Sequence, residues 1–113
     1  MSILQYSSSK HGKVVLIKIG GRLDAETAPN FNNKLIGEIN KGQNNIIINM
    51  EKLSYIASAG LGVLISVNES VRKKSGEIKI SSMNEKIQKI FKLLGFLNLF
   101  QIFDDDESAL DSF

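Results

Sequence analysis

Cysteine is absent from the 113 residues, and histidine occurs once, as His11. The absence of cysteine excludes disulfide bonds, thiolate nucleophiles and cysteine-ligated metals, and it is typical of cytosolic proteins. No basic stretch followed by an apolar block opens the chain, and no apolar run approaches the roughly 20 residues that a membrane helix requires. We therefore expect a soluble cytoplasmic protein without a membrane partner.

A large charge of one sign is also absent. The chain has 14 basic and 12 acidic residues, so its formal net charge is only +2, and its lysines are spread along the sequence. Nucleic acid is therefore not an expected partner. Hydrophobic residues make up 42% of the chain, which is enough for the core of one domain. Because no linker, repeat or low-complexity segment divides the sequence, we expect a single domain over residues 1–113.

Segments typical of strands alternate with segments typical of helices. Apolar and β-branched runs predict strands at residues 3–7, 13–19, 46–50, 77–80 and 100–103. Apolar residues at helical spacing predict helices that end near residues 39, 74 and 94, and the acidic run 104–107 predicts the start of a short terminal helix. The order β-β-α-β-α-β-α-β-α predicts an α/β fold with a mixed sheet and helices packed against it.

Several local patterns refine this prediction. Residues 7–12 resemble the turn of a hairpin between the first two strands, and Gly20-Gly21 is predicted to end the second strand. The continuous apolar run Ile46–Ile48 is typical of a central strand that is covered on both faces. Asp24 or Thr27 can cap the first helix, and the apolar faces of the helices are predicted to include Ile36 and Leu94.

The most informative segment places a serine where a strand passes into a helix. Ser58 follows the strand-like run that begins at Ile46, and a helix is predicted from Ala59. Backbone N–H groups are unpaired at a helix start, so a phosphate on this hydroxyl would meet free donors. Serine is also among the preferred N-cap residues, which gives Ser58 a purely structural interpretation. Both interpretations remain open at this stage.

The neighbours of Ser58 are small. Ala57 and Ala59 leave the hydroxyl open, while Gly60 and Gly62 would let the backbone of another protein approach closely. Leu61, between these glycines, is expected to project as an apolar contact. Close packing of the helix on the sheet is the alternative explanation for the glycines.

The run Leu53–Leu64 resembles the phosphorylation-site signature of the anti-sigma factor antagonists, which are STAS domains. In that family an acidic residue, a serine, a small residue and Gly-Leu-Gly follow one another, and here Ala57 stands in the place of the acid. The segment Gly21-Arg22-Leu23-Asp24 is similar to the family's Gly-x-Leu-Asp turn. The resemblance covers nearly the whole chain and implies the STAS fold.

The resemblance also implies a function. Such a protein binds an anti-sigma factor, which is also a serine kinase, while its serine is unphosphorylated, and a serine phosphatase reverses the modification. Carried over to this chain, Ser58 is the phosphoacceptor and needs no cofactor of its own, because the kinase supplies ATP and magnesium. The implied contact residues are Asp24, Ala57, Ala59, Gly60, Leu61 and Gly62.

Two other functions fit parts of the sequence. A STAS subunit docked on a transporter ATPase, or a signalling scaffold, would keep the fold without a phosphorylation switch. A third possibility is a small hydrolase or phosphotransfer enzyme with Ser58 as nucleophile; a serine hydrolase would need a histidine partner, and nothing ties His11 to Ser58. The consecutive acids at 104–107 lack the alternating spacing of a calcium loop. If Phe96, Leu97 and Leu99 are exposed, they form a second contact surface.

Overall fold

The computed structural model describes all 113 residues and contains five strands and four helices. Their order confirms the predicted α/β fold. The elements are β1 (Leu4–His11), β2 (Val14–Leu23), α1 (Ala28–Asn40), β3 (Asn45–Ile56), α2 (Ser58–Arg72), β4 (Glu77–Ser81), α3 (Glu85–Leu94), β5 (Gln101–Phe103) and α4 (Asp106–Asp111).

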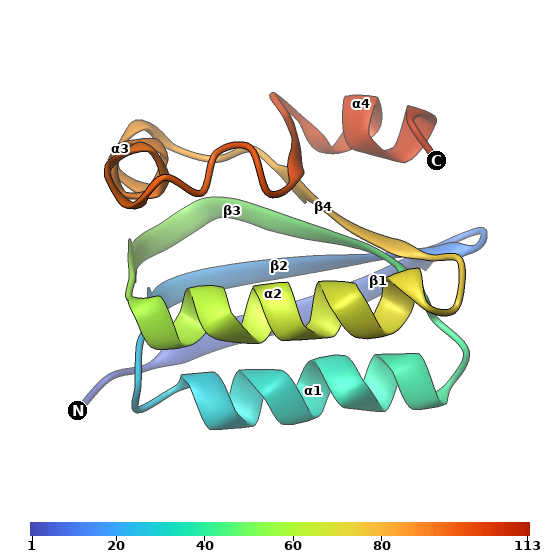
Figure 1. The fold of residues 1–113 in the computed structure, drawn as a ribbon, viewed down its shortest axis with the longest axis horizontal. Helices are drawn as coiled ribbons and strands as arrows, with labels where there is room; N and C mark the ends of the chain where they lie inside the picture. Colours follow the sequence, from blue (N-terminus) through green and yellow to red (C-terminus); the bar gives the residue numbers. More distant parts are fainter.

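The strands form one mixed sheet in the order β1-β2-β3-β4-β5. β1 pairs antiparallel with β2, and the remaining pairs are parallel, with Ile17 opposite Ile48 and Ile48 opposite Ile80. Helices α1 and α2 lie side by side on one face of this sheet (Figure 1), and the buried residues of α3 belong to the same apolar cluster, whereas α4 packs against the opposite face through Ala109. The predicted hairpin and mixed sheet are both confirmed.

The core is centred on β3, whose side chains are buried on both faces. Ile46 and Ile48 belong to the main apolar cluster, which includes residues of α1 and α2, whereas Ile47 packs with Val14, Leu16 and Ala109 of α4. A strand covered by helices on both sides reads as a continuous apolar run. The prediction of a central strand over residues 46–50 is therefore confirmed, although β3 continues to Ile56.

The expected end of β2 at Gly20-Gly21 is wrong. The strand continues to Leu23 because register shifts on both sides of Gly20-Gly21 absorb the irregular backbone without ending the pairing with β3. Gly21 has a φ of 87°, and a Cβ at this position would lie 2.4 Å from the carbonyl oxygen of Ile3. β1 is likewise longer than expected, since residues 7–11 extend the strand to a tight turn at Gly12.

Two predicted apolar faces were too wide. Ile36 is 37% exposed and Leu94 is 42% exposed, so the buried faces narrow to Phe31, Leu35 and Ile39 in α1 and to Ile87 and Phe91 in α3. Gly95 ends α3 in the left-handed conformation, as expected. No helix combines the length and the hydropathy that crossing a bilayer would require.

Candidate functional site

Ser58 is the first residue of α2, directly after the end of β3. The N-cap position belongs to Ala57, which has extended backbone angles and no side-chain cap hydrogen bond. The structural interpretation of Ser58 as an N-cap is therefore wrong. The side chain of Ser58 is exposed, and its hydroxyl has no hydrogen-bond partner within the protein.

The backbone at this junction leaves donors free. The amide of Ala57 donates to the carbonyl of Leu23 at 2.9 Å, and the amides of Gly60 and Leu61 donate to the carbonyl of Ala57 at 3.0 and 3.2 Å. The amides of Ser58 and Ala59 have no acceptor in the protein, and the first turn of α2 contains no acidic residue. Two free N–H groups at the positive end of a helix dipole favour an anion at this place.

The two glycines after Ser58 have different environments. A Cβ at Gly60 would lie 2.5 Å from Cγ and 3.0 Å from the carbonyl oxygen of Leu23, whose side chain is fully buried. Gly60 is therefore required for close packing of α2 against β2. A Cβ at Gly62 would meet nothing within 4 Å, and Gly62 is exposed. Only Gly62 is thus free to admit the backbone of a partner.

The expected outward orientation of Leu61 is wrong. Leu61 is only 1% exposed and belongs to the main apolar cluster, because the helix turns its first apolar side chain toward the sheet. The exposed part of this segment consists of Ser58, Ala59 and Gly62, with Ala57 and Val63 partly exposed. We call these five residues the α2 patch; it is small, neutral and weakly apolar.

Asp24 lies beside the α2 patch, because the preceding residue, Leu23, contacts the start of α2. The carbonyl of Leu23 accepts a hydrogen bond from the amide of Ala57, and Leu23 packs against Gly60. Its carboxylate accepts hydrogen bonds from the Ser2 hydroxyl and from the amides of Glu26 and Thr27. The bond from Ser2 does most to lower the pKa of Asp24, partial desolvation opposes the shift, and bonds from Thr27, Glu26 and Arg22 add to the lowering. Asp24 therefore organises the loop before α1 and stays ionised.

Sequence reasoning missed the residues that hold this loop. The Arg22 Nε lies 3.5 Å from Asp24, and the guanidinium stacks 4.4 Å from the centre of the Tyr55 ring. Ser2 contacts Asp24 and Glu26 from the N-terminal segment. These contacts depend on the pairing of β2 with β3 and on segments that are distant in sequence, so no local sequence pattern predicts them.

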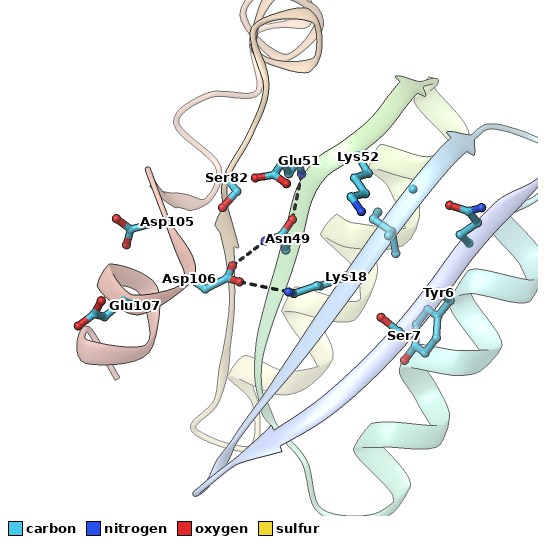
Figure 2. Close-up of a pocket in the computed structure, with 13 residues that line it drawn as sticks. Tyr6, Ser7, Lys18, Asn49, Glu51, Lys52, Ser82, Asp105, Asp106 and Glu107 are labelled. Atoms are coloured by element: carbon cyan, nitrogen blue, oxygen red, sulfur yellow. Dashed lines mark hydrogen bonds and ion pairs between the residues drawn. The ribbon is translucent and has the colours of Figure 1, made fainter.

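A separate polar groove of about 680 Å³ lies on the side of the sheet that α4 borders (Figure 2). In it Asp106 accepts hydrogen bonds from the Asn49 side chain at 2.7 Å and the Ser81 hydroxyl at 2.6 Å, and it lies 4.0 Å from the Lys18 ammonium. These polar groups are engaged with one another, and none of the predicted site residues lines the groove.

His11 lies at the opposite end of β2 from Ser58. It pairs with Val14 at the start of β2, whereas Leu23 at the end of β2 pairs with Ile56, two residues before Ser58. The imidazole lies 2.9 Å from the Ser9 hydroxyl. The structure therefore forms no Ser58–His11 nucleophile–base pair.

Residues 5–109 match the family model of the STAS domain. The chain belongs to the STAS domain family. The match spans β1 to α4, so the resemblance seen at the Ser58 segment extends through the whole fold.

This STAS domain is similar to anti-sigma factor antagonists over more than nine-tenths of its length. The anti-sigma-B factor antagonist of Staphylococcus aureus is 26% identical over 104 residues, which cover 92% of this chain and 96% of that protein. The anti-sigma factor antagonist SpoIIAA in its unphosphorylated form has a TM-score of 0.82 at 21% identity, covering 96% of this chain and 95% of that one. The phosphorylated form of SpoIIAA from Bacillus has a TM-score of 0.74 at 22% identity, covering 96% and 98%.

Proposed function

We propose that this STAS domain is an anti-sigma factor antagonist whose binding is controlled by phosphorylation of Ser58. In this proposal it is a regulatory binding protein rather than an enzyme. Unmodified, it binds an anti-sigma factor that is also a serine kinase, through the α2 patch and the neighbouring Asp24 loop. The kinase ends the binding by phosphorylating Ser58, and a serine phosphatase restores it.

The observation that carries the proposal is the open environment of the Ser58 hydroxyl. It is exposed, has no partner in the protein, and stands next to the free amides of Ser58 and Ala59. A hydroxyl with a structural role would be engaged, as that of Ser54 is in its 2.8 Å bond to the carbonyl of Gly21. The similarity to SpoIIAA, which exists in phosphorylated and unphosphorylated forms, supports the same assignment.

Phosphorylation would change the surface without unfolding the domain. A phosphoserine carries about −1.5 to −2 charges at pH 7 and three acceptor oxygens. The free amides and the helix dipole offset this charge at the start of α2, while the buried residues Leu61 and Leu64 keep the helix on the sheet. A partner that fits the neutral α2 patch would then face a charge it cannot pair.

Mass spectrometry of the intact protein tests the phosphorylation step. The wild-type chain, Ser58→Ala and Ser54→Ala are each incubated with ATP, magnesium and candidate anti-sigma kinases from the same genome. We expect one added phosphoryl group on the wild type and on Ser54→Ala, and none on Ser58→Ala. Ser54 is the matched control because it is exposed and only four residues away.

The binding step is tested with Ser58→Asp. A carboxylate in the first turn is favourable for the helix, so the variant should keep its melting temperature and bind the anti-sigma factor less tightly than the wild type. Equal affinity would show that charge at this position does not control binding.

One observation favours a second candidate function. Ala57 stands where the resembled signature has an acid, and a kinase that requires this acid would not modify the chain. The protein would then be a STAS docking subunit of a transporter ATPase or a signalling scaffold. No phosphorylation by any candidate kinase, together with binding to a transporter ATPase that Ser58→Asp leaves unchanged, would support this alternative.

A further inference from the structure

One edge of the sheet is formed by β1, which is long, regular and nearly uncharged. It pairs with β2 through eight consecutive residue pairs without a bulge. The strand contains no proline and no acidic residue, and its basic residues, Lys10 and His11, stand together at its end. The opposite edge, β5, has only three residues. Proteins protect edge strands by charge, proline, bulges or short length, so β1 is the edge that is open to pairing.

The free backbone groups of β1 follow from its hydrogen bonds to β2. The amide of Arg22 donates to the carbonyl of Ile3 at 2.9 Å. In an antiparallel pair hydrogen-bonded residues alternate with non-hydrogen-bonded ones, so the odd-numbered residues of β1 bond to β2. The even-numbered residues direct both their N–H and their C=O groups away from β2: Leu4, Tyr6, Ser8 and Lys10. None of these eight groups is bonded to a loop, a turn or another helix or strand.

These eight groups are arranged symmetrically about Ser7, which is what pairing with an identical strand requires. In an antiparallel pair with Ser7 opposite Ser7, Leu4 faces Lys10 of the second copy and Tyr6 faces Ser8. Every outward N–H and C=O group then has a partner, and no two like charges face each other directly. A register shifted by two residues in either direction leaves one of the four residues unpaired in each copy.

The helix next to β1 carries one charge of each sign. Tyr6 packs on Phe31 of α1, and the Lys34 ammonium lies 4.7 Å from the centre of the Tyr6 ring. Burial, and then the nearby carboxylate of Glu38, raise the pKa of Tyr6 to about 12. A two-fold axis through Ser7, perpendicular to the sheet, brings the two α1 helices side by side and antiparallel. Lys34 of one copy and Glu38 of the other are then complementary, and neither forms an ion pair within one copy.

We propose that β1 pairs antiparallel with β1 of a second copy of this chain, with Ser7 on the two-fold axis, giving a closed dimer. The product is one continuous sheet with five strands from each copy. Leu4 pairs with Gly21, and Leu23 with Ile56, so the start of β1 and the start of α2 lie at the same end of the sheet. The antiparallel arrangement therefore places the two α2 patches at opposite ends of the dimer. The contact is independent of the proposed role of Ser58.

A single cysteine tests the register, because the chain contains no cysteine of its own. Ser7→Cys places two thiols directly opposite each other in a non-hydrogen-bonded pair, where a disulfide fits. Ser9→Cys is the matched control, since Ser9 is also exposed but faces Gln5 of the second copy. With oxidised glutathione as oxidant, Ser7→Cys should form a disulfide dimer of twice the 12.5 kDa chain mass. Ser9→Cys should crosslink at least about tenfold less, because its thiols lie roughly 13 Å apart along the strands.

The outward amide of Ser8 tests the hydrogen bonds. Proline is tolerated on an edge strand where the N–H faces solvent, so Ser8→Pro should keep the fold and lose this donor in both copies. Sedimentation equilibrium over a range of concentrations should show a wild-type dimer, and Ser8→Pro should dimerise about tenfold less tightly. Ser8→Thr keeps the amide and should dimerise like the wild type. Hydrogen exchange gives a third readout: the amides of Tyr6 and Ser8 should become protected as the wild-type concentration rises.

Three outcomes would overturn the proposal. They are a wild type that stays monomeric at all concentrations, equal crosslinking of Ser7→Cys and Ser9→Cys, and exchange at Tyr6 and Ser8 that does not depend on concentration. Melting curves check that the variants fold. If Ser8→Pro lowers the melting temperature, the two cysteine variants decide, because both keep every backbone amide.

Discussion

The starts of α2 and α3 satisfy their backbone groups in opposite ways. At α3 the side chain of Asn84 accepts a hydrogen bond from the amide of Ile87 at 3.0 Å. The same side chain donates to the carbonyls of Met50, Glu51 and Leu53 at 3.2, 3.0 and 2.8 Å. At α2 the N-cap is Ala57, which has no side-chain group to offer.

This difference separates a structural junction from an open one. Asn84 ties the start of α3 to the second half of β3, so that junction is closed by the protein's own groups. The start of α2 is instead held on the side that faces the sheet. There Gly60 packs against Leu23, and the side chains of Leu61 and Leu64 are buried. The solvent-facing side of this helix start carries two free amides and the Ser58 hydroxyl, so it is available to a phosphoryl group or a partner.

The largest expected effect is at the closed junction. Asn84→Ala removes the cap of α3 and leaves carbonyls of β3 without their donor, so it should lower the free energy of unfolding by about 2–4 kcal/mol. Ser58→Ala should change it by less than about 0.5 kcal/mol, as expected of an exposed side chain without partners. Urea denaturation of both variants checks the contrast, and a loss of similar size in Ser58→Ala would contradict it.

The two glycines of α2 should respond with opposite signs. Gly60→Ala forces a methyl group onto buried Leu23 and should destabilise the protein by about 1–3 kcal/mol. Gly62→Ala points into open space and should stabilise the exposed helix by about 0.5–1 kcal/mol. Thermal melting of the pair measures the difference. Destabilisation by Gly62→Ala would show that this glycine, too, is needed for packing.

A capping residue at position 57 should convert the open junction into a closed one. Ala57→Asp provides an acceptor for the free amides and should stabilise the protein by about 0.5–2 kcal/mol. The same change supplies the acid of the resembled signature. If the candidate kinase recognises that acid, the variant should also be phosphorylated faster than the wild type, and Ala59→Asp serves as the control for added charge. An unchanged melting temperature would contradict the inference that residue 57 occupies the N-cap position and that the helix start lacks a side-chain acceptor there.

The smallest expected effect is a pH dependence at the Asp24 loop. The pKa of Asp24 is lowered in the folded state, chiefly by the Ser2 hydroxyl. The folded state therefore binds this proton less readily than the unfolded state, and the stabilisation is present above the unfolded pKa and lost as pH falls through the folded pKa. Asp24→Asn should lose stability at neutral pH and approach the wild type in acid. Urea denaturation across a pH series measures this, and a constant difference would contradict it.

The fold was predictable where local patterns agree with tertiary contacts. Three local patterns predicted what the structure shows. The apolar run Ile46–Ile48 predicted the central strand, Gly95 predicted the end of α3, and the acidic residues before α4 predicted the start of that helix. The end of β2 was not predictable, because the strand passes Gly20-Gly21 by register shifts that depend on its pairing with β3. The similarity of residues 5–109 to STAS domains shows why the order of elements could nevertheless be predicted.

The candidate site was predictable in position but not in detail. Sequence placed Ser58 at a strand-to-helix junction, and the structure confirms that location. It could not decide whether Leu61 points inward, since one residue of shift at the helix start rotates every side chain by 100°. Asn84 could have been found, because an asparagine three residues before Ile87 fits a helix N-cap. The pairing of Arg22 with Tyr55 required the register of the sheet.

The most direct test compares the affinity of the anti-sigma factor for the unmodified domain and for the domain phosphorylated on Ser58, with melting temperatures measured for both. The open start of α2 predicts tight binding by the unmodified form, loss of most of that affinity on phosphorylation, and a melting temperature that does not fall. Equal affinities for the two forms would contradict the switch. A phosphorylated form that unfolds would contradict the inference that the helix start accommodates the phosphate.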